Sequence, residues 1–243
     1  MTSARDTLFA KTLGDPGLFS FNEAVVGVFP DMIKRSVPGY STVIAMTGLL
    51  AARHAREGKR IYDLGCSLGA SLLSVARHDE VAQCELIGID NSAAMLEQCR
   101  VSLDTELPGN TIELISGDIT EQAYKHACVA ILNYTLQFVP VDKRLPLLQQ
   151  LRQAMEPGDI LILSEKITLS APAMDTLMID MHHDFKRAQG YSDLEIAQKR
   201  QALENVLVPE SLDSHVTRLT QAGFSHAECW FQCFNFASLI AIA

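Results

Sequence analysis

Short apolar runs alternate with amphipathic stretches through the middle of the chain. Between the runs, apolar residues recur every three to four positions, as Met95, Cys99 and Leu103 do, which is the spacing of one helix face. Runs that are apolar throughout are typical of parallel strands covered on both faces. The alternation therefore predicts an α/β protein with a mostly parallel, doubly wound sheet. The expected parallel strands are 61–64, 84–89, 111–115, 128–132 and 160–163.

Helical patterns lie on both sides of this alternating region. Pro30 and the Pro38-Gly39 pair divide residues 21–56 into about three helices. Two further helical patterns meet at Gln189-Gly190-Tyr191, and the runs 227–231 and 234–242 predict a closing antiparallel hairpin. We therefore expect one domain with a seven-stranded sheet. Its expected parts are an N-terminal helical cap (1–57), a central core (58–165), a helical insert (173–208) and a C-terminal helix with hairpin (209–243).

A glycine turn joins the first expected strand to a helix within the stretch Lys59 to Ala70. Asp63 stands at the end of the strand, and Gly65 permits a ligand to approach the backbone closely. The helix that starts after Gly69 leaves backbone N–H groups unpaired. Many nucleotide-binding α/β domains begin with this strand, turn and helix. Because many such turns bind nothing, the turn alone leaves a binding role and a structural role open.

Polar residues follow four of the expected strands, at Asp63, Asp90, Asp118 and Asn133. Parallel strands end at one edge of a sheet, so these side chains are expected around one crevice. A carboxylate at Asp90 can accept both hydroxyls of a ribose, and Asp118 with Ile119 can pair with an adenine edge. Asp63 would repel a pyrophosphate, so the ligand should be cationic or lack phosphate. The alternative is that these residues only cap turns.

Charge and cysteine usage narrow the class of protein. The chain of 243 residues has a formal net charge of −9, and no basic face stands out, which disfavours direct binding of nucleic acid. The six cysteines form no C-x-x-C pair and lie mostly in apolar surroundings, as reduced thiols of a cytosolic protein do. No apolar run approaches the ~18 residues of a membrane span. We therefore expect a soluble, cytoplasmic protein without membrane contact.

The turn and the strand ends together resemble those of the class I S-adenosylmethionine-dependent methyltransferases. In that family an acidic residue and three alternate glycines follow the first strand. Here the motif runs from Asp63 to Gly69, with Ser67 in place of the middle glycine. A more specific similarity, to the carboxy-S-adenosylmethionine synthase family, extends over nearly the whole chain. It is carried by FPDMIKRSVPGY (29–40), YDLGCSLGA (62–70), IDNS (89–92), NYTLQF (133–138), LSEK (163–166), MHHDFKRAQGYSDLEIAQKR (181–200) and WFQCFNF (230–236).

This resemblance implies a Rossmann-like methyltransferase fold with 58–165 as the cofactor-binding core. It implies synthesis of carboxy-S-adenosylmethionine from S-adenosylmethionine and prephenate, with release of phenylpyruvate. A separate enzyme would then use the product to carboxymethylate the wobble uridine of tRNA, so no direct, stable tRNA binding is expected here. The family also implies a homodimer. Its contacts with the cofactor or product would fall on Tyr40, Gly65, Cys66, Ser67, Asp90, Asn91, Asp118, Ile119, Asn133 and Arg200, to which the strand-end argument adds Asp63.

Two of these residues acquire a role mainly through the resemblance. The Tyr40 hydroxyl would form a hydrogen bond with the methionyl end of the cofactor. Without the resemblance, Tyr40 would be interpreted as an aromatic residue packed in the core. Arg200 would clamp the added carboxylate with its planar fork of donors, whereas on its own it would be read as a solvated helix charge. The resemblance leaves the carboxylates of prephenate unplaced and assigns no catalytic residue. Lys34, Arg35, Lys186 and Arg187 are the cations considered for prephenate.

Two other functions remain open from the sequence. One is an ordinary methyltransferase that acts on a small molecule or RNA, and the other is a non-enzymatic scaffold subunit that binds S-adenosylmethionine. A metal centre is not expected, although His182 and His183 stand next to Asp184. Adjacent residues on a helix point about 100° apart, and such histidines seldom share one ion.

Overall fold

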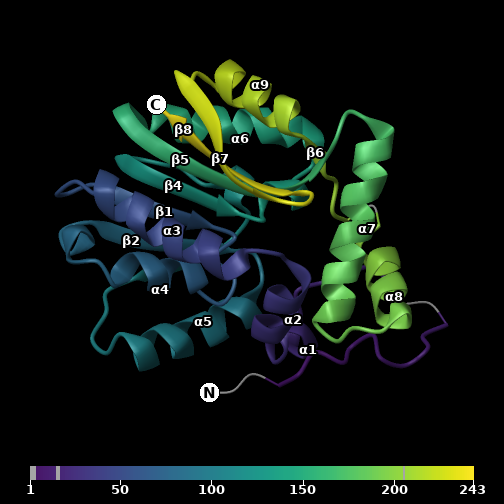
Figure 1. Ribbon diagram of the computed structural model, residues 1–243. Coiled ribbons are helices and arrows are strands. Elements are labelled where there is room, and N and C mark those ends of the chain that lie inside the picture. The colour runs from purple at the N-terminus through teal and green to yellow at the C-terminus, as the bar shows by residue number, and fades with distance from the viewer. Residues whose placement is uncertain (1–3, 15–16, 205) are drawn as a thin grey trace.

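A computed structural model describes residues 4–14, 17–204 and 206–243 (Figure 1). Within these ranges the sheet has eight strands, of which seven follow the order β3-β2-β1-β4-β5-β8-β7. The predicted mostly parallel sheet with an antiparallel C-terminal hairpin is confirmed. The first five run parallel, and β8 lies antiparallel to both β5 and β7. A two-residue strand, β6 (Glu210–Ser211), also pairs with β5 and was not predicted. The bounds are β1 Arg60–Leu64, β2 Glu85–Asp90, β3 Glu113–Ser116, β4 Ala127–Asn133, β5 Met155–Thr168, β7 His226–Cys233 and β8 Phe236–Ile242.

Helices cover both faces of this sheet (Figure 1). Successive residues of β1 point to opposite faces: Ile61 packs with Ala51 of α3, and Tyr62 packs in the cluster that contains Leu147 of α6. This arrangement explains the continuous apolar runs, because both faces of each central strand are buried. The covering helices are α3 (Tyr40–His54), α4 (Ala70–Ala76) and α5 (Ala93–Glu106) on one face, and α6 (Val141–Gln153) and α9 (Leu212–Ala222) on the other.

The remaining helices stand beside the sheet (Figure 1). The expected N-terminal cap contains α1 (Glu23–Val26) and α2 (Phe29–Ser36) before α3, and the expected insert contains α7 (Pro172–Ala188) and α8 (Asp193–Leu203). Arg35 Nε of α2 donates to the carbonyl of Gln189, 2.8 Å away, and His182 Nε2 of α7 donates to that of Ser36, also 2.8 Å away. The insert therefore packs against the N-terminal cap. Short 3₁₀ turns span Asp79–Val81, Ile119–Glu121 and Leu136–Phe138.

Two local expectations are wrong. The helix expected to begin at an Asp142 cap and to end at Met155 runs from Val141 to Gln153, after Pro140. The Pro157-Gly158 pair does not separate it from a strand at 160–163, because β5 already begins at Met155. Met155 pairs with Ala127 and Ile160 pairs with Val129, so the proline and glycine lie in a bulge within one strand.

The described helices include none that is both long and apolar enough to span a lipid bilayer. All six cysteines are free thiols, as predicted.

Candidate functional site

The glycine turn after β1 is tied to the end of β2. The backbone nitrogens of Gly65 and Cys66 both donate to the carbonyl of Ile89, at 2.8 and 3.0 Å. Gly65 has φ +75°, and a Cβ added to it would come within 2.5 Å of the Thr135 side chain. Both observations require glycine at this position, because only glycine lacks the Cβ. The turn therefore lies against the loop that follows β4.

Ser67 occupies the position of the missing motif glycine and keeps the backbone conformation of a glycine. Its φ is +49°, in the left-handed region that residues with a side chain rarely adopt. Its backbone nitrogen donates to Asp90 Oδ2 at 2.9 Å, and its hydroxyl lies 3.5 Å from the sulfur of Met95. The departure from the glycine motif thus leaves the path of the turn unchanged.

Two carboxylates at the ends of β1 and β2 lack a cationic partner among the described residues. Asp63 is 2% exposed, and its Oδ2 has no hydrogen-bond partner. Burial, together with the charge of Asp90, raises the pKa of Asp63 to about 7. Burial also raises the pKa of Asp90, although backbone N–H groups, including those of Ser92 and Ser67, oppose this effect. The pair is therefore suited to a ligand that brings positive charge.

Tyr40 begins α3 directly after Gly39, whose φ of +76° turns the chain into the helix. Burial and the charge of Asp63 raise the pKa of the Tyr40 hydroxyl. The Tyr40 ring lies on that of Tyr134, with 6.1 Å between centroids. Tyr40 therefore lies close enough to Asp63 for the two groups to interact electrostatically.

The residues expected at an adenine lie on the loop after β3. Asp118 is exposed, and its Oδ1 accepts a hydrogen bond from the backbone nitrogen of Thr120 at 2.8 Å. Ile119, which follows it, is buried. Asn91, at the end of β2, is exposed. The structure thus places the acidic and apolar residues expected to surround an adenine next to each other at the ends of β2 and β3.

Asn133 has a different local role from the other strand-end residues. Its amide nitrogen donates to Thr47 Oγ1 at 3.2 Å and to Ser71 Oγ at 3.0 Å, and its amide oxygen accepts from Ser164 Oγ at 2.7 Å. The side chain therefore joins α3, α4 and β5 to the end of β4. Asn133 thus has a structural role at the end of β4.

Cys66 is buried beside Cys99 of α5. A hydrogen bond with Cys99 raises the pKa of the Cys66 thiol, and burial raises it further. A thiol with a raised pKa is a poor nucleophile at neutral pH, because the thiolate is the reactive form. Cys66 therefore contributes its backbone to the turn.

Glu165, near the end of β5, was not among the predicted site residues. Its two carboxylate oxygens accept hydrogen bonds from the backbone nitrogens of Leu136 and Gln137, each at 2.9 Å. Glu165 is fully buried, and this raises its pKa to about 8. The sequence feature that could have identified Glu165 is an acidic residue at the end of an apolar run that predicts a buried strand. The carboxylate shapes the loop that lies against Gly65.

Arg200 lies on the exposed side of α8 and makes no ion pair among the described residues. Its charge lowers the pKa values of Lys166 on β5 and His183 on α7, so it lies near the end of β5. Its guanidinium is therefore exposed and without an ion pair within the described part of the chain.

Comparison with known proteins agrees with the predicted fold. A family model described as a methyltransferase domain matches residues 61–158. The magnesium protoporphyrin IX methyltransferase of Synechocystis, solved with bound S-adenosylmethionine, superposes with a TM-score of 0.55 at 16% identity. That superposition covers 83% of this chain and 78% of the other, and it supports the class I methyltransferase fold.

Two relatives match the chain from end to end. The carboxy-S-adenosyl-L-methionine synthase of Trichlorobacter lovleyi is 54% identical over 100% of both chains. The protein of the same name from Escherichia fergusonii is 50% identical over 99% of this chain and 97% of its own. On this evidence the chain belongs to the carboxy-S-adenosyl-L-methionine synthase family.

Proposed function

We propose that the protein is an enzyme that makes carboxy-S-adenosyl-L-methionine from S-adenosyl-L-methionine and prephenate, and that it releases phenylpyruvate. The observation that carries the proposal is the 54% identity, over the full length of both chains, to a relative with this name. The acidic pair Asp63 and Asp90 supports it, because no described cation pairs with these carboxylates and S-adenosylmethionine is a cation with no phosphate. Arg200 supports it as a guanidinium that has no ion pair among the described residues and acts on Lys166 near the end of β5.

The residues at this edge fit an adenosyl compound. Asp90 would accept the ribose hydroxyls, and Asp118 with Ile119 would bind the adenine. Tyr40 would bond the methionyl end, close to the unpartnered Oδ2 of Asp63. Gly65 would allow the close approach, because a side chain there would have to share its space with Thr135. The protein then contributes to the reaction mainly by positioning the two substrates and by providing charges complementary to theirs.

The overall reaction balances without an external oxidant or base. The ring carboxyl of prephenate leaves as carbon dioxide, and its bonding electrons make the ring aromatic as the ring hydroxyl departs. That hydroxide takes a proton from the cofactor's methyl group and becomes water. A bond forms between the methyl carbon and the carbon dioxide. A closed site would retain carbon dioxide and exclude bulk water.

Mass spectrometry of the reaction mixture tests this proposal. Purified protein incubated with S-adenosylmethionine and prephenate should yield an adenosyl product about 44 mass units heavier, the mass of the added carbon dioxide, together with phenylpyruvate. Formation of S-adenosylhomocysteine with a methylated acceptor would instead identify an ordinary methyltransferase. Binding of S-adenosylmethionine without conversion, under conditions in which a family member is active, would identify a scaffold.

We propose further that the protein acts in the cytoplasm and supplies its product to a separate tRNA carboxymethyltransferase for modification of the wobble uridine. The net charge of −9 supports a separate tRNA-binding enzyme, because phosphate contacts need a basic face. The six free thiols fit a reducing compartment. Gel-shift titration with tRNA should show no stable complex with this protein alone, whereas the downstream enzyme should bind.

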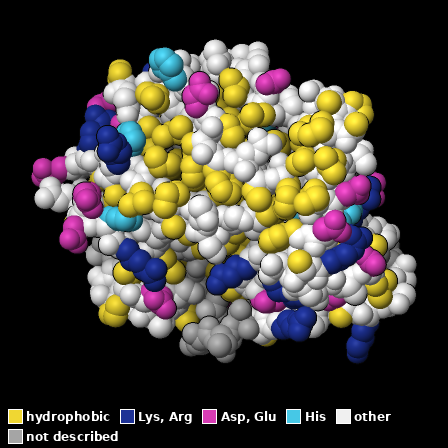
Figure 2. All heavy atoms as spheres, viewed as in Figure 1, with side chains coloured by type: hydrophobic (Ala, Val, Ile, Leu, Met, Phe, Trp, Pro, Cys, Tyr) yellow, Lys and Arg dark blue, Asp and Glu magenta, His cyan; other side chains and the backbone are white. Residues whose placement is uncertain are grey.

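We also propose a homodimer. Large apolar side chains are exposed along one side of α7, at Met174, Leu177 and Met181, and on α3 at Leu49. Figure 2 shows that hydrophobic side chains gather across this face of the molecule. Contiguous exposed apolar surface commonly marks a subunit interface. Leu177→Glu should shift the mass measured by light scattering from dimer to monomer, whereas Val101→Glu on α5 should not. A monomeric parent protein would contradict the proposal.

A further inference from the structure

Three cations from different parts of the chain act on one side chain of the insert, His183. Its neighbour His182 lies 4.8 Å from Phe236, the register partner of Lys166. Lys166 lies near the end of β5, Lys186 lies on α7 and Arg200 lies on α8. Their charges act on one another and on His183, because Lys166, Lys186 and Arg200 all lower the pKa of that histidine. None of the three cations has an ion pair or side-chain hydrogen bond among the described residues. The insert and the sheet edge thus carry positive charge that no ion pair neutralises within the described part of the chain.

Two other cations of the insert, Arg187 and Lys199, have partners within the chain. Arg187 forms ion pairs with Asp184 at 2.6 Å and Asp193 at 2.8 Å. Lys199 donates to Ser36 Oγ at 2.9 Å and lies 3.9 Å from Asp6 Oδ2. These contacts hold the segment together. Lys186, one residue before Arg187, lies 5.6 Å from the centre of the Tyr191 ring but has no acidic partner among the described residues, so its ammonium can still accept a carboxylate.

Arg35 is also paired and has a structural role. It donates to Asp31 at 3.0 Å and to the Gln189 carbonyl at 2.8 Å, and its guanidinium lies 3.9 Å from the centre of the Tyr191 ring. Lys34, its neighbour on α2, is exposed. Of the four cations considered for the acid substrate from the sequence, only Lys186 is both buried and without an acidic partner.

Burial makes the unpaired charge at Lys186 costly. The side chain belongs to a residue that is 6% exposed, and burial, with the charge of Lys166, lowers the pKa of Lys186 to about 8. Asp6 and Glu195 act on this lysine from a distance, but neither forms an ion pair with it. Lys166 is half-buried, and burial with the charge of Arg200 lowers its pKa, which Asp175 only partly opposes. A bound carboxylate would stabilise both ammonium groups.

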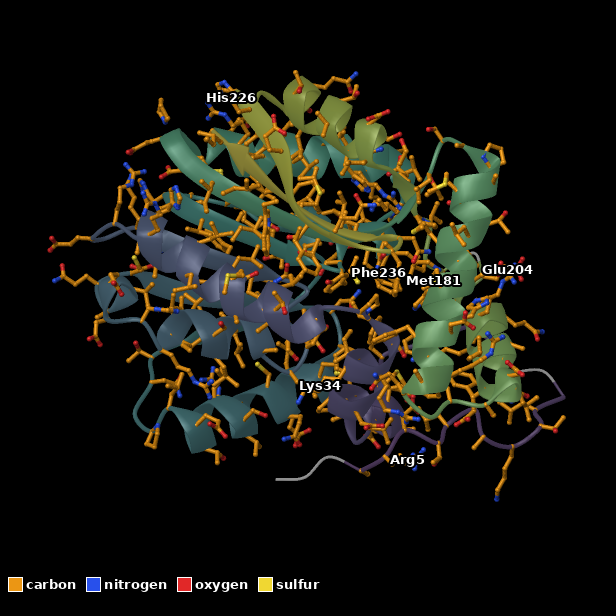
Figure 3. The ribbon with its side chains drawn as sticks, in the orientation of Figure 1. Arg5, Lys34, Met181, Glu204, His226 and Phe236 are labelled. Atoms are coloured by element: carbon orange, nitrogen blue, oxygen red, sulfur yellow. The ribbon has the colours of Figure 1, made fainter. Side chains whose placement is uncertain are left out.

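Aromatic rings connect this region to the acidic pair. The ring of His182 lies 4.8 Å from that of Phe236, which lies 6.3 Å from that of Tyr134. Tyr134 in turn lies 6.1 Å from Tyr40. Lys166 is the register partner of Phe236 in the sheet, and Phe236 lies beside α7 (Figure 3). A compound with an unsaturated ring and carboxylates could therefore contact aromatic side chains and the lysines at once.

We propose that Lys166 and Lys186 bind the carboxylate of the acid co-substrate that stays with the leaving keto acid, while Arg200 receives the carboxyl group that is transferred. The inference rests on the proposed function, which supplies a substrate with two carboxylates. The cations then fall into two groups, according to which part of the substrate each one binds. The two lysines recognise the part that departs, and the arginine recognises the part that remains on the adenosyl product.

Steady-state kinetics of Lys166→Met and Lys186→Met test this division. Methionine keeps an unbranched side chain of similar length and removes the charge. Each variant should raise the KM for prephenate about tenfold or more, with a smaller change in kcat. The Kd for carboxy-S-adenosylmethionine, measured by calorimetry, should stay within about twofold of the parent value. Lys34→Met removes an exposed cation from α2 and should change neither quantity.

The outcomes separate this inference from the proposed function. No turnover by the parent enzyme overturns both. Turnover with an unchanged KM for prephenate in both variants overturns only the lysine site, as does an equal loss of affinity for carboxy-S-adenosylmethionine in well-folded variants. If Lys186→Met fails to fold, as shown by an early melting transition and loss of adenosyl binding, the half-buried Lys166 decides the question alone.

Discussion

The carboxylate of Asp90 accepts a hydrogen bond from the backbone nitrogen of Ser67, at 2.9 Å. The acid at the end of β2 therefore holds the turn that follows β1 in place. Its other oxygen accepts from the backbone nitrogen of Ser92, also at 2.9 Å, at the start of α5. A carboxylate oxygen can accept more than one hydrogen bond, so these contacts leave capacity for ribose hydroxyls. Asp90 thus links the shape of the turn to ligand recognition.

Asp90→Ala should weaken both S-adenosylmethionine and carboxy-S-adenosylmethionine to a similar degree. The substitution removes hydrogen bonds to a charged group, each worth about 1.5–3 kcal/mol, so we expect a loss of affinity of at least about tenfold. Calorimetric titration with each compound measures the effect. An unchanged affinity would exclude ribose recognition at this residue, and a loss confined to one compound would place Asp90 near the group in which they differ.

Ser67→Gly should restore the glycine motif with little change in function. The left-handed backbone at Ser67 costs a residue with a side chain about 1–2 kcal/mol, whereas glycine adopts it freely but loses more entropy on folding. The two effects nearly cancel. We expect affinity for S-adenosylmethionine within about twofold and a similar melting temperature. By contrast, Ser67→Val should destabilise the protein, because a β-branched residue is unfavourable at positive φ.

The affinity for S-adenosylmethionine should fall as pH falls through 7. The pKa of Asp63 in the free protein is about 7, because burial and Asp90 disfavour its charged form. A cationic ligand stabilises the carboxylate and lowers this pKa in the complex. The favourable interaction is therefore fully present above pH 7 and is lost below it, by up to about tenfold per pH unit.

Calorimetry of the parent protein and Asp63→Asn between pH 6 and 8 checks this dependence. The variant should bind weakly at every pH and should lack most of the slope. Glu165 also titrates in this range, with a pKa of about 8, and it remains in both proteins. Equal slopes in the two proteins would therefore assign the dependence to a group other than Asp63.

Much of the fold follows from local patterns in the sequence. The central parallel strands were predictable because they are buried on both faces and so have nearly continuous apolar runs, as β4 does. The bulge of β5 was not, because Pro157-Gly158 resembles a turn and only the pairing of Met155 with Ala127 shows that the strand has already begun. The capping box at Ser192 and Glu195 marks the start of α8 locally, and it is present in the structure.

The candidate site was predictable only in part. Asp63 and Asp90 could be placed together because the ends of adjacent parallel strands meet at one edge. Asn133 obeys the same rule, yet its amide is bonded to Thr47 and Ser71, which come from helices far away in the sequence. Lys166 looked like an ordinary residue at a strand end. Its role in the cation group depends on how α7 and α8 pack, which no local pattern specifies.

Arg200→Ala should distinguish the two adenosyl compounds. Arg200 is exposed and unpaired within the described part of the chain, so its removal should disturb the fold little. The guanidinium is proposed to contact only the carboxylate that the product carries. The Kd for carboxy-S-adenosylmethionine should therefore rise about 10- to 150-fold, and that for S-adenosylmethionine should change by less than about twofold.

Arg200→Lys provides the matched comparison, since it keeps the charge but loses the planar fork of donors, and it should recover only part of the affinity. Competition binding with both compounds on the same protein preparation measures the ratio directly. An equal loss for both compounds would remove the assigned role of Arg200, because a residue that reads the carboxylate has no reason to affect the compound that lacks it. Full recovery by lysine would instead indicate attraction by charge alone, without bidentate contact.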